Sequence, residues 1–167
     1  MASPQSLLEM AGAPLEPSAW DKAALVLIDA QMEYVDGKLP LPGVKAALDE
    51  AARVLRLARR QGAPVIHVVH HGRPGGALFD PNGIHAKIAP EVAPETSEPI
   101  IVKGLPNAFA RTDLQKTVDA TATRDLPDPL MCPEAHGVQK AETVHRATLA
   151  ALADRFAIVV RNARAWT

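Results

Sequence analysis

Cysteine and aromatic residues are scarce in this chain. Its 167 residues include one cysteine, so no disulfide framework can form within the chain. Phenylalanine, tryptophan and tyrosine together make up only 4% of the residues. No apolar run approaches the ~20 residues that a membrane-spanning helix needs, and the formal net charge is −1. The sequence therefore gives no reason to expect a membrane or a nucleic acid as partner.

The N-terminal segment also lacks the features of a secretory signal. Pro4, Glu9, Pro14 and Glu16 interrupt any apolar core, and no basic residue precedes them. We therefore expect a cytoplasmic protein in which residues 1–22 form a Pro-rich leader that packs on the domain.

The rest of the chain has the composition of one globular domain. Hydrophobic residues make up 47% and charged residues 22% of the sequence, which are ordinary values. The length suffices to bury a sizeable core. No internal repeat, low-complexity tract or linker interrupts the sequence, so residues 23–167 are expected to form a single domain.

Aliphatic runs alternate with helical patterns along this domain. Continuous apolar segments at residues 23–29, 64–70 and 99–103 are typical of strands that are buried on both faces. Residues 44–61 place apolar side chains at intervals of three and four, which predicts an amphipathic helix that ends before Gly62.

The remaining segments extend this alternation. A Gly/Pro-rich loop is predicted for residues 71–99, with a helical turn near Ile84–Ile88. A helix is predicted for residues 138–154 and a last strand for residues 156–160. Strands that alternate with helices indicate an α/β protein with three layers, α/β/α, around a mainly parallel, Rossmann-like sheet.

Two charged residues end two of the predicted strands. Asp29 follows six apolar residues, and Lys103 ends a shorter apolar run. In an open parallel sheet ligands bind at the carboxyl edge of the strands, and opposite charges there suit a catalytic site. Alternatively, Asp29 caps the next element or pairs with an arginine, and Lys103 extends from the strand end into solvent.

Four residues in the loops beyond these strand ends are candidates for binding a substrate. Gln31 and Tyr34 follow the first strand, and Asn107 and Phe109 follow the third. Polar loop residues are solvated by default, and a single aromatic residue is most often part of the core. Both alternatives stay open at this point.

Histidines at the second strand raise the question of a metal site. His67, His70 and His71 lie close in sequence, and Asp80 and His85 follow in the loop. Residues three apart on a strand point to opposite faces, whereas a transition-metal site needs ligands that converge. We therefore expect neither a metal nor another cofactor.

One segment combines two conflicting local signals. Thr112-Asp113-Leu114-Gln115 is similar to a capping box that opens a helix. Residues 116–121 then look like a strand and its exit. A helix start with no helix behind it is a conflict between local preferences and requires an explanation.

Together these motifs resemble the isochorismatase-like cysteine hydrolases. In that family the first strand ends in Asp-x-Gln, as in Asp29-Ala30-Gln31, and a later strand ends in a lysine, as at Lys103. The resemblance implies the family's fold and a small-molecule substrate, and it leaves a homo-oligomer open. Similar runs continue it over nearly the whole chain, at residues 6–12, 107–114, 143–149 and 156–160.

The resemblance also implies what this chain is missing. In the family the Asp is the general base for a cysteine, and the Lys orients the pair. The thiolate attacks a carbonyl, usually of an amide, and water releases the acyl group. We infer that the βα unit with this cysteine and its oxyanion hole, roughly 30 or more residues, is missing between Gln115 and Lys116. Cys132, in a proline-flanked loop, is not expected to replace it.

Three hypotheses about function follow. The first is a hydrolase by lineage that acts on a small amide or related C–N substrate, with its present activity in question because the nucleophile is missing. The second is a catalytically inactive remnant or interaction module. The third is hydrolysis of a vinyl ether without cysteine, in which Asp29 donates a proton and Lys103 supports it. A flavodoxin-like nucleotide-binding module is disfavoured, because no Gly-rich phosphate loop follows the first strand.

Overall fold

The computed structural model describes residues 6–14, 16–121 and 163–166 of the chain. The chain divides into two compact units, of which one is the continuous segment Ala19–Asp125. The other combines both ends of the chain, Met1–Ser18 and Leu126–Thr167. Three sequence predictions lie outside the described residues and stay predictions: a helix at residues 138–154, a strand at residues 156–160 and a loop around Cys132.

Among its described residues, the unit formed by the chain ends has two short helices. Helix α1 (Leu7–Met10) begins at Ser6, whose Oγ accepts the Glu9 N–H while the Glu9 carboxylate accepts the Ser6 N–H. Such a capping box satisfies N–H groups that a single helical turn leaves free. A 3-10 helix, η4 (Ala163–Trp166), lies near the C-terminus. The packing of residues 1–22 on the domain stays a prediction.

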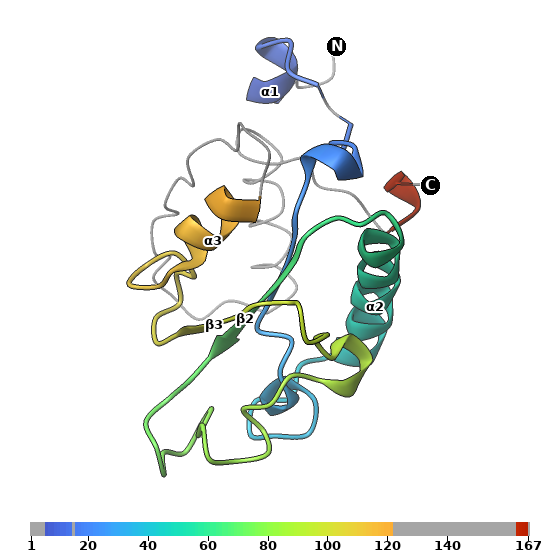
Figure 1. Ribbon diagram of the computed structural model, residues 1–167. Coiled ribbons are helices and arrows are strands. Elements are labelled where there is room, and N and C mark those ends of the chain that lie inside the picture. Colours follow the sequence, from blue (N-terminus) through green and yellow to red (C-terminus); the bar gives the residue numbers. More distant parts are fainter. Residues whose placement is uncertain (1–5, 15, 122–162, 167) are drawn as a thin grey trace. The chain divides into compact units, whose positions relative to one another are not determined.

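A three-stranded parallel sheet is the centre of the other unit (Figure 1). Its strands β1 (Leu25–Ile28), β2 (Val65–His70) and β3 (Ile100–Lys103) lie in the order β1-β2-β3. All three predicted strands are confirmed, each within two residues at either end. The 3-10 turn η1 (Trp20–Lys22) leads into the first of them.

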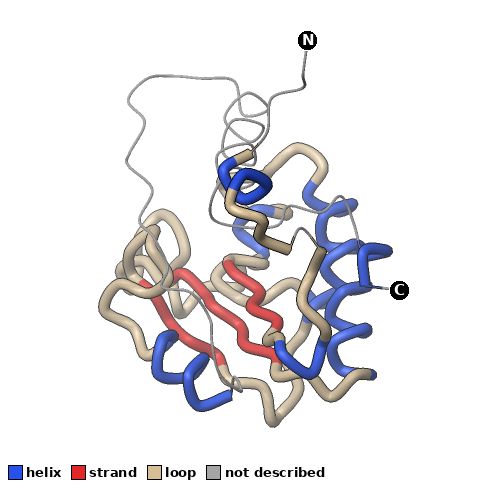
Figure 2. Tube along the Cα trace, turned by 90° about the horizontal axis from the view of Figure 1, so that it is seen from above, coloured by secondary structure: helices blue, strands red, loops and turns tan. Residues whose placement is uncertain are grey.

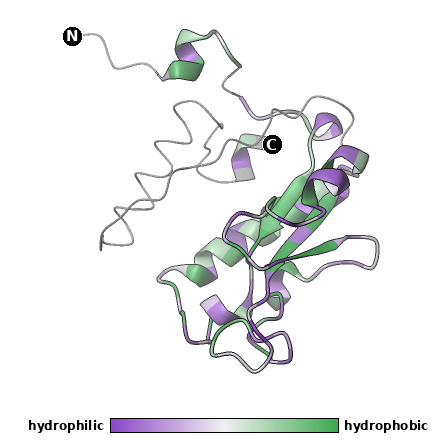
Figure 3. Cartoon of the chain, turned by 90° about the vertical axis from the view of Figure 1, so that its left-hand side faces the viewer, coloured by the Kyte–Doolittle hydropathy of each residue, from purple (hydrophilic) through white to green (hydrophobic). Residues whose placement is uncertain are grey.

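Helices on both faces of the sheet confirm the α/β class and its three layers (Figure 2). Helix α2 (Val44–Arg60) packs on one face, and helix α3 (Leu114–Thr121) packs on the other. Central strand β2 is therefore buried on both sides, which explains its continuous apolar sequence. Figure 3 shows this concentration of apolar residues on the strands. On the α2 side Leu55 and Ala58 pack near Val65, and on the α3 side Leu114 and Val118 pack near Ile66 and Val68.

Helix α2 follows its sequence prediction to within one residue. Gly43 precedes it with a φ of +75°, and Gly62 follows it with a φ of +68°, a region that L-residues with side chains rarely adopt. Arg59 and Arg60 lie in the last turn, where positive charge is favourable beside the helix dipole.

The loop between β2 and β3 corrects one prediction. Residues near Ile84–Ile88 form turns rather than the predicted helical turn, and Ile88 pairs with Gln31 in an isolated antiparallel bridge. The helical turn lies later, at the 3-10 helix η3 (Pro90–Val92). Pro90 explains this position, because its fixed φ suits the first residue of a helix.

Helix α3 corrects a second prediction. Residues 116–121 are helical, so their interpretation as a strand was wrong. Leu114 and Val118, four residues apart, are both buried, and this spacing outweighs the β-branched residues of the segment. The helix also crosses the proposed junction between Gln115 and Lys116. The missing βα unit stays a prediction, but the local conflict that placed it there does not exist.

The edge strands leave apolar side chains half-exposed. Within the described residues, β1 and β3 are the two edges of the sheet. Ile28 on β1 and Ile100 and Val102 on β3 are each about half-exposed. A sheet of this width therefore covers its central strand well and its edges only in part.

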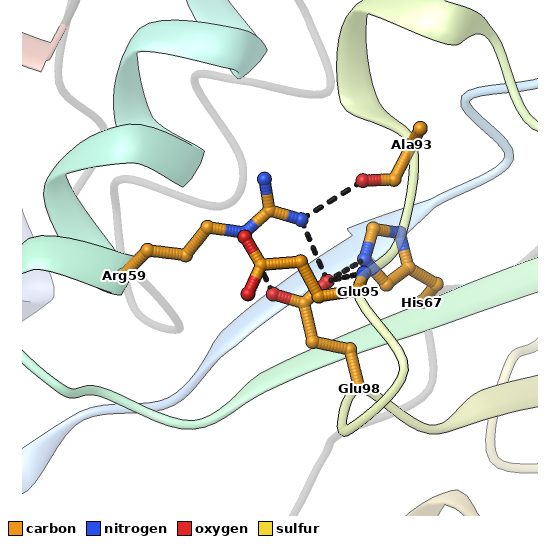
Figure 4. A network of polar contacts seen from close by, with 5 residues as sticks. All are labelled: Arg59, His67, Ala93, Glu95 and Glu98. Carbon is orange, nitrogen blue, oxygen red and sulfur yellow. Dashed lines mark hydrogen bonds and ion pairs between the residues drawn. The ribbon is translucent and has the colours of Figure 1, made fainter.

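A partly buried network of charges joins α2, β2 and the segment before β3 (Figure 4). Arg59 donates from Nε and Nη2 to the two Glu98 oxygens, each at 2.8 Å, and Nη2 also donates to the Ala93 carbonyl. His67 Nε2 lies 2.9 Å from Glu98 Oε2, which also accepts the Glu95 N–H. The hydrogen bonds from Arg59 are the main cause that lowers the pKa of Glu98 from 4.5 to about 2.

This network makes stability depend on pH in a defined direction. Because the pKa of Glu98 is lowered on folding, its contribution is complete above pH 4.5 and is lost as the pH falls toward 2. The shift corresponds to roughly 3 kcal/mol. We predict that Glu98→Gln lowers the free energy of unfolding by about 3 kcal/mol at pH 7, because Arg59 and His67 lose the carboxylate that they share. Urea unfolding between pH 2 and 7 measures the difference from the wild type.

The matched control is Glu95→Gln, which removes an exposed carboxylate 3.3 Å from the same arginine. This control is expected to change stability by less than about 1 kcal/mol. A difference between wild type and Glu98→Gln that stays constant from pH 7 to pH 2 would contradict the role given to the Glu98 carboxylate.

Candidate functional site

Asp29 and Lys103 meet at the carboxyl edge of the sheet. Asp29 directly follows β1, and Lys103 ends β3. Both strands pair with β2 near its carboxyl end, where Ile28 is opposite Val68 and Lys103 is opposite His70. Asp29 Oδ2 lies 2.8 Å from Lys103 Nζ. The Lys103 side chain is only 3% exposed and the Asp29 side chain 24%. The alternatives of an arginine partner for Asp29 and a solvated Lys103 are therefore wrong.

The second carboxylate oxygen of Asp29, Oδ1, takes no part in this ion pair. Oδ1 is buried, and nothing among the described residues hydrogen-bonds to it. The backbone of Asp29 has a φ of +58°, in the left-handed region that few residues with side chains occupy. Such conformations concentrate at functional sites. The strained aspartate with a buried, unpaired oxygen marks this edge of the sheet as the candidate site.

Both the side chain and the backbone of Lys103 make hydrogen bonds to neighbouring residues. Its Nζ also donates to the Pro106 carbonyl at 3.3 Å, and its backbone carbonyl accepts the His71 N–H at 3.0 Å. The ammonium group is therefore buried, with the Asp29 carboxylate and the Pro106 carbonyl as its partners.

Gln31 connects the loop after β1 to its neighbours. Its Nε2 donates to the carbonyls of His70 and Ala86 at 2.9 and 2.6 Å, and its Oε1 accepts the His70 N–H at 2.7 Å. The buried amide thus fixes the end of β2 against the loop. Its contact with a substrate stays a prediction, and the bonds seen here are positional.

Three rings lie together beside the ion pair. The Phe79 ring contacts Tyr34 edge-on, with centroids 5.3 Å apart, and contacts His70 in the same way at 4.9 Å. Burial, and then the charge of Asp29, raises the pKa of Tyr34 above 10. Burial, and then the charge of Lys103, lowers the pKa of His70 below 6.5. Both groups are therefore neutral at pH 7.

His70 and Glu33 were not selected from the sequence as site residues. His70 ends β2, just as Asp29 and Lys103 mark the ends of the neighbouring strands, so the same rule could have found it. Glu33 is a buried carboxylate that accepts the N–H groups of Lys38 and Phe79. Those two bonds are the main causes that lower its pKa. No spacing in the sequence indicates its burial.

Asn107 and Phe109 lie on the exposed loop after β3. Asn107 Oδ1 accepts the Phe109 N–H at 2.9 Å, which closes a local turn. Phe109 is 36% exposed, so its alternative interpretation as a core residue was wrong. Substrate binding by Asn107, Phe109 and Tyr34 stays a prediction.

The histidines of β2 do not converge. His67 contacts Glu98 on the α2 side of the sheet, whereas His70 contacts Phe79 near the strand end. In the part of the chain that the structure describes, no group of three or more His, Cys, Asp or Glu is arranged to hold a metal ion.

The ion pair itself can be tested through stability. We predict that Lys103→Met lowers the free energy of unfolding by about 3 kcal/mol, because Asp29 is left as a partly buried charge without its partner. Adding Asp29→Asn removes that charge and restores most of the loss, since Asn tolerates the left-handed backbone. Urea unfolding of the wild type, both single variants and the double variant measures this coupling. Losses that simply add would contradict it.

Comparison with known proteins agrees with this geometry. Residues 23–126 match the isochorismatase domain family. An isochorismatase from Pseudomonas putida KT2440 has a similar solved structure, with a TM-score of 0.78 and 32% identity over 96% of this chain and 98% of that one.

Two curated relatives show similarity over part of their length. A secreted isochorismatase effector, Isc1, from Verticillium dahliae is 32% identical over 72% of this chain and 64% of its own length. The maleamate amidohydrolase of Pseudomonas putida is 32% identical over 59% of this chain and 54% of its own length. The chain therefore spans between about half and two thirds of these relatives.

None of the described helices is both long enough and apolar enough to cross a bilayer. The cytoplasmic location and the homo-oligomer stay predictions. The parallel sheet, the Asp29–Lys103 pair at its carboxyl edge and the match over residues 23–126 together show that this chain belongs to the isochorismatase family.

Proposed function

We propose that this chain is a hydrolase by descent that binds a small amide or related C–N compound at the Asp29–Lys103 pair. We further propose that it turns such compounds over slowly or not at all, because it has lost the segment with the nucleophilic cysteine. The observation that carries the proposal is the buried Asp29 Oδ1, which has no hydrogen-bond partner among the described residues, beside the 2.8 Å ion pair.

An amide complements this arrangement of charges. Its N–H groups can donate to Asp29 Oδ1, and a hydrogen bond to a charged acceptor is worth about 1.5–3 kcal/mol. Lys103 Nζ lies 2.8 Å from Asp29 Oδ2, so Oδ1 is the carboxylate oxygen that remains to accept such a hydrogen bond. The name of one relative, maleamate amidohydrolase, supports an amide as the ligand class.

Hydrolysis of an amide needs a nucleophile as well as a base. The single cysteine, Cys132, lies outside the described residues. The proline-flanked loop predicted for it is not the electropositive, preorganised setting that a reactive thiol requires. Binding without efficient turnover is therefore the expected behaviour.

A second candidate is hydrolysis of a vinyl ether without cysteine. The same Asp29 Oδ1 favours it, because a buried carboxylate oxygen without a partner can carry the proton that such a reaction delivers to carbon. Lys103 would then stabilise the carboxylate after proton transfer. This reaction needs only the two residues that the structure brings together.

Binding and turnover of two probes distinguish these functions. We predict that maleamate binds the wild type and that Asp29→Asn weakens binding roughly tenfold or more, because a charged hydrogen-bond acceptor is lost. Calorimetric titration measures binding, and ammonia release measures turnover. The matched control is Asp36→Asn, which removes an exposed carboxylate and should leave binding unchanged.

Each other outcome has a defined meaning. Ammonia release that disappears in Cys132→Ala would make Cys132 the nucleophile and would contradict the proposal. Turnover of isochorismate that needs Asp29 but not Cys132 would favour the vinyl-ether candidate. A folded protein that binds neither probe would leave only an interaction module or an inactive remnant.

A further inference from the structure

One buried carboxylate, that of Glu33, has no role in the chemistry proposed above. Glu33 is 3% exposed. Its Oε1 accepts the Lys38 N–H at 2.7 Å, and its Oε2 accepts the Phe79 N–H at 3.0 Å. Burying a charge is costly unless hydrogen bonds compensate it. The two N–H groups supply that compensation, so the position of Glu33 and the positions of these two backbones depend on each other.

Phe79 is the strained partner in this arrangement. Its φ of +50° lies in the left-handed region, which a bulky side chain rarely adopts. Its N–H donates to Glu33 and its carbonyl accepts the Gly72 N–H at 2.8 Å. A backbone of this kind persists only where its surroundings fix it. Glu33 is the charged member of those surroundings.

The Phe79 ring connects this anchor to the candidate site. It contacts Tyr34 on one side and His70 on the other, both edge-to-face. His70 pairs with Lys103 in the register of the sheet, and Tyr34 follows Asp29 by five residues. The path from Glu33 to these two rings therefore consists of one hydrogen bond, to Phe79, and the two ring contacts of Phe79.

We propose that Glu33 is a positioning residue of the Asp29–Lys103 site, and that by fixing Phe79 it holds the rings of Tyr34 and His70 beside the ion pair. The inference rests on the proposed function in taking this pair as the ligand site. The position of the rings can nevertheless be measured without any ligand.

Two titrations report the position of the rings. Tyr34 is the sole tyrosine of the chain, so ultraviolet absorbance of the phenolate follows it alone. NMR of the imidazole protons follows His70, with the signal assigned through His70→Gln. The charged and titratable groups that act on His70 are Lys103, Asp29 and His71. Burial is the largest influence, and it lowers the pKa of His70. The Phe79 ring, whose centroid lies 4.9 Å from that of His70, is one of the groups packed against it.

The variant Glu33→Ala separates positioning from simple charge. If Glu33 positions the rings, its loss hydrates His70, and we predict that the pKa of His70 rises toward 6.5. Loss of a nearby negative charge alone would move that pKa in the opposite direction or leave it unchanged. The pKa of Tyr34 is expected to fall toward 10 under either explanation, because burial, Asp29 and the charge of Glu33 itself all raise it, so the direction of the His70 shift decides between them. Glu33→Gln, which retains one carbonyl acceptor, should lie between wild type and Glu33→Ala.

Two further variants complete the experiment. Asp36→Asn removes an exposed carboxylate three residues along and should change neither titration. Phe79→Leu retains Glu33 but removes both ring contacts, and it should raise the pKa of His70 as Glu33→Ala does. If Glu33→Ala fails to fold, Glu33→Gln keeps the test decisive, because it changes Glu33 itself. An unchanged or lowered pKa of His70 in the folded variants would overturn the proposal.

Ligand binding then separates this inference from the proposed function. If both hold, Glu33→Ala weakens maleamate binding while Asp36→Asn does not. If maleamate fails to bind the wild type but the pKa of His70 still rises in Glu33→Ala, the proposed function fails and the positioning role stands. If maleamate binds and the titrations do not move, the positioning role fails alone.

Discussion

The burial of one ammonium group constrains this structure more than any other interaction. Lys103 ends β3 with its charge inside the protein, and such a charge needs an anion within reach. Asp29 supplies it from the end of β1, with β2 between the two strands. The carboxyl ends of β1 and β3 are therefore linked by an ion pair that passes over the end of β2. At this position Asp29 has a φ of +58°, and its Oδ1 has no hydrogen-bond partner among the described residues.

The loops around the pair are fixed by buried polar side chains. The Gln31 amide hydrogen-bonds to the end of β2 and to Ala86 in the loop between β2 and β3. Glu33 hydrogen-bonds to Phe79 in the same loop and to Lys38 in the segment before α2. Backbone bonds between residues 30–33 and 85–89 reinforce both contacts. Loops that carry functional residues are usually mobile, and fixing them lowers the entropic cost of binding a ligand. The site is thus preorganised by groups that sequence patterns do not distinguish from solvated loop residues.

Features that depend on neighbouring residues in the sequence could be predicted, and features that depend on contacts between distant residues could not. The strands and α2 were predictable, because apolar runs and a 3.6-residue period are local signals. The pairing of Asp29 with Lys103 followed from the edge rule for parallel sheets. Helix α3 was misinterpreted, because β-branched residues suggested a strand where the burial of Leu114 and Val118 decides. Glu33 and Phe79 depend on contacts 46 residues apart in the chain, which no local pattern encodes.

The central claim is that this family member retains the ligand-binding half of its active site at Asp29 and Lys103 without the nucleophile. A crystal structure of the protein with maleamate bound tests it most directly. The account predicts the amide nitrogen within hydrogen-bond distance of Asp29 Oδ1 and no covalent bond to Cys132. Maleamate bound away from the ion pair, or an acyl group attached to Cys132 beside Asp29, would contradict it.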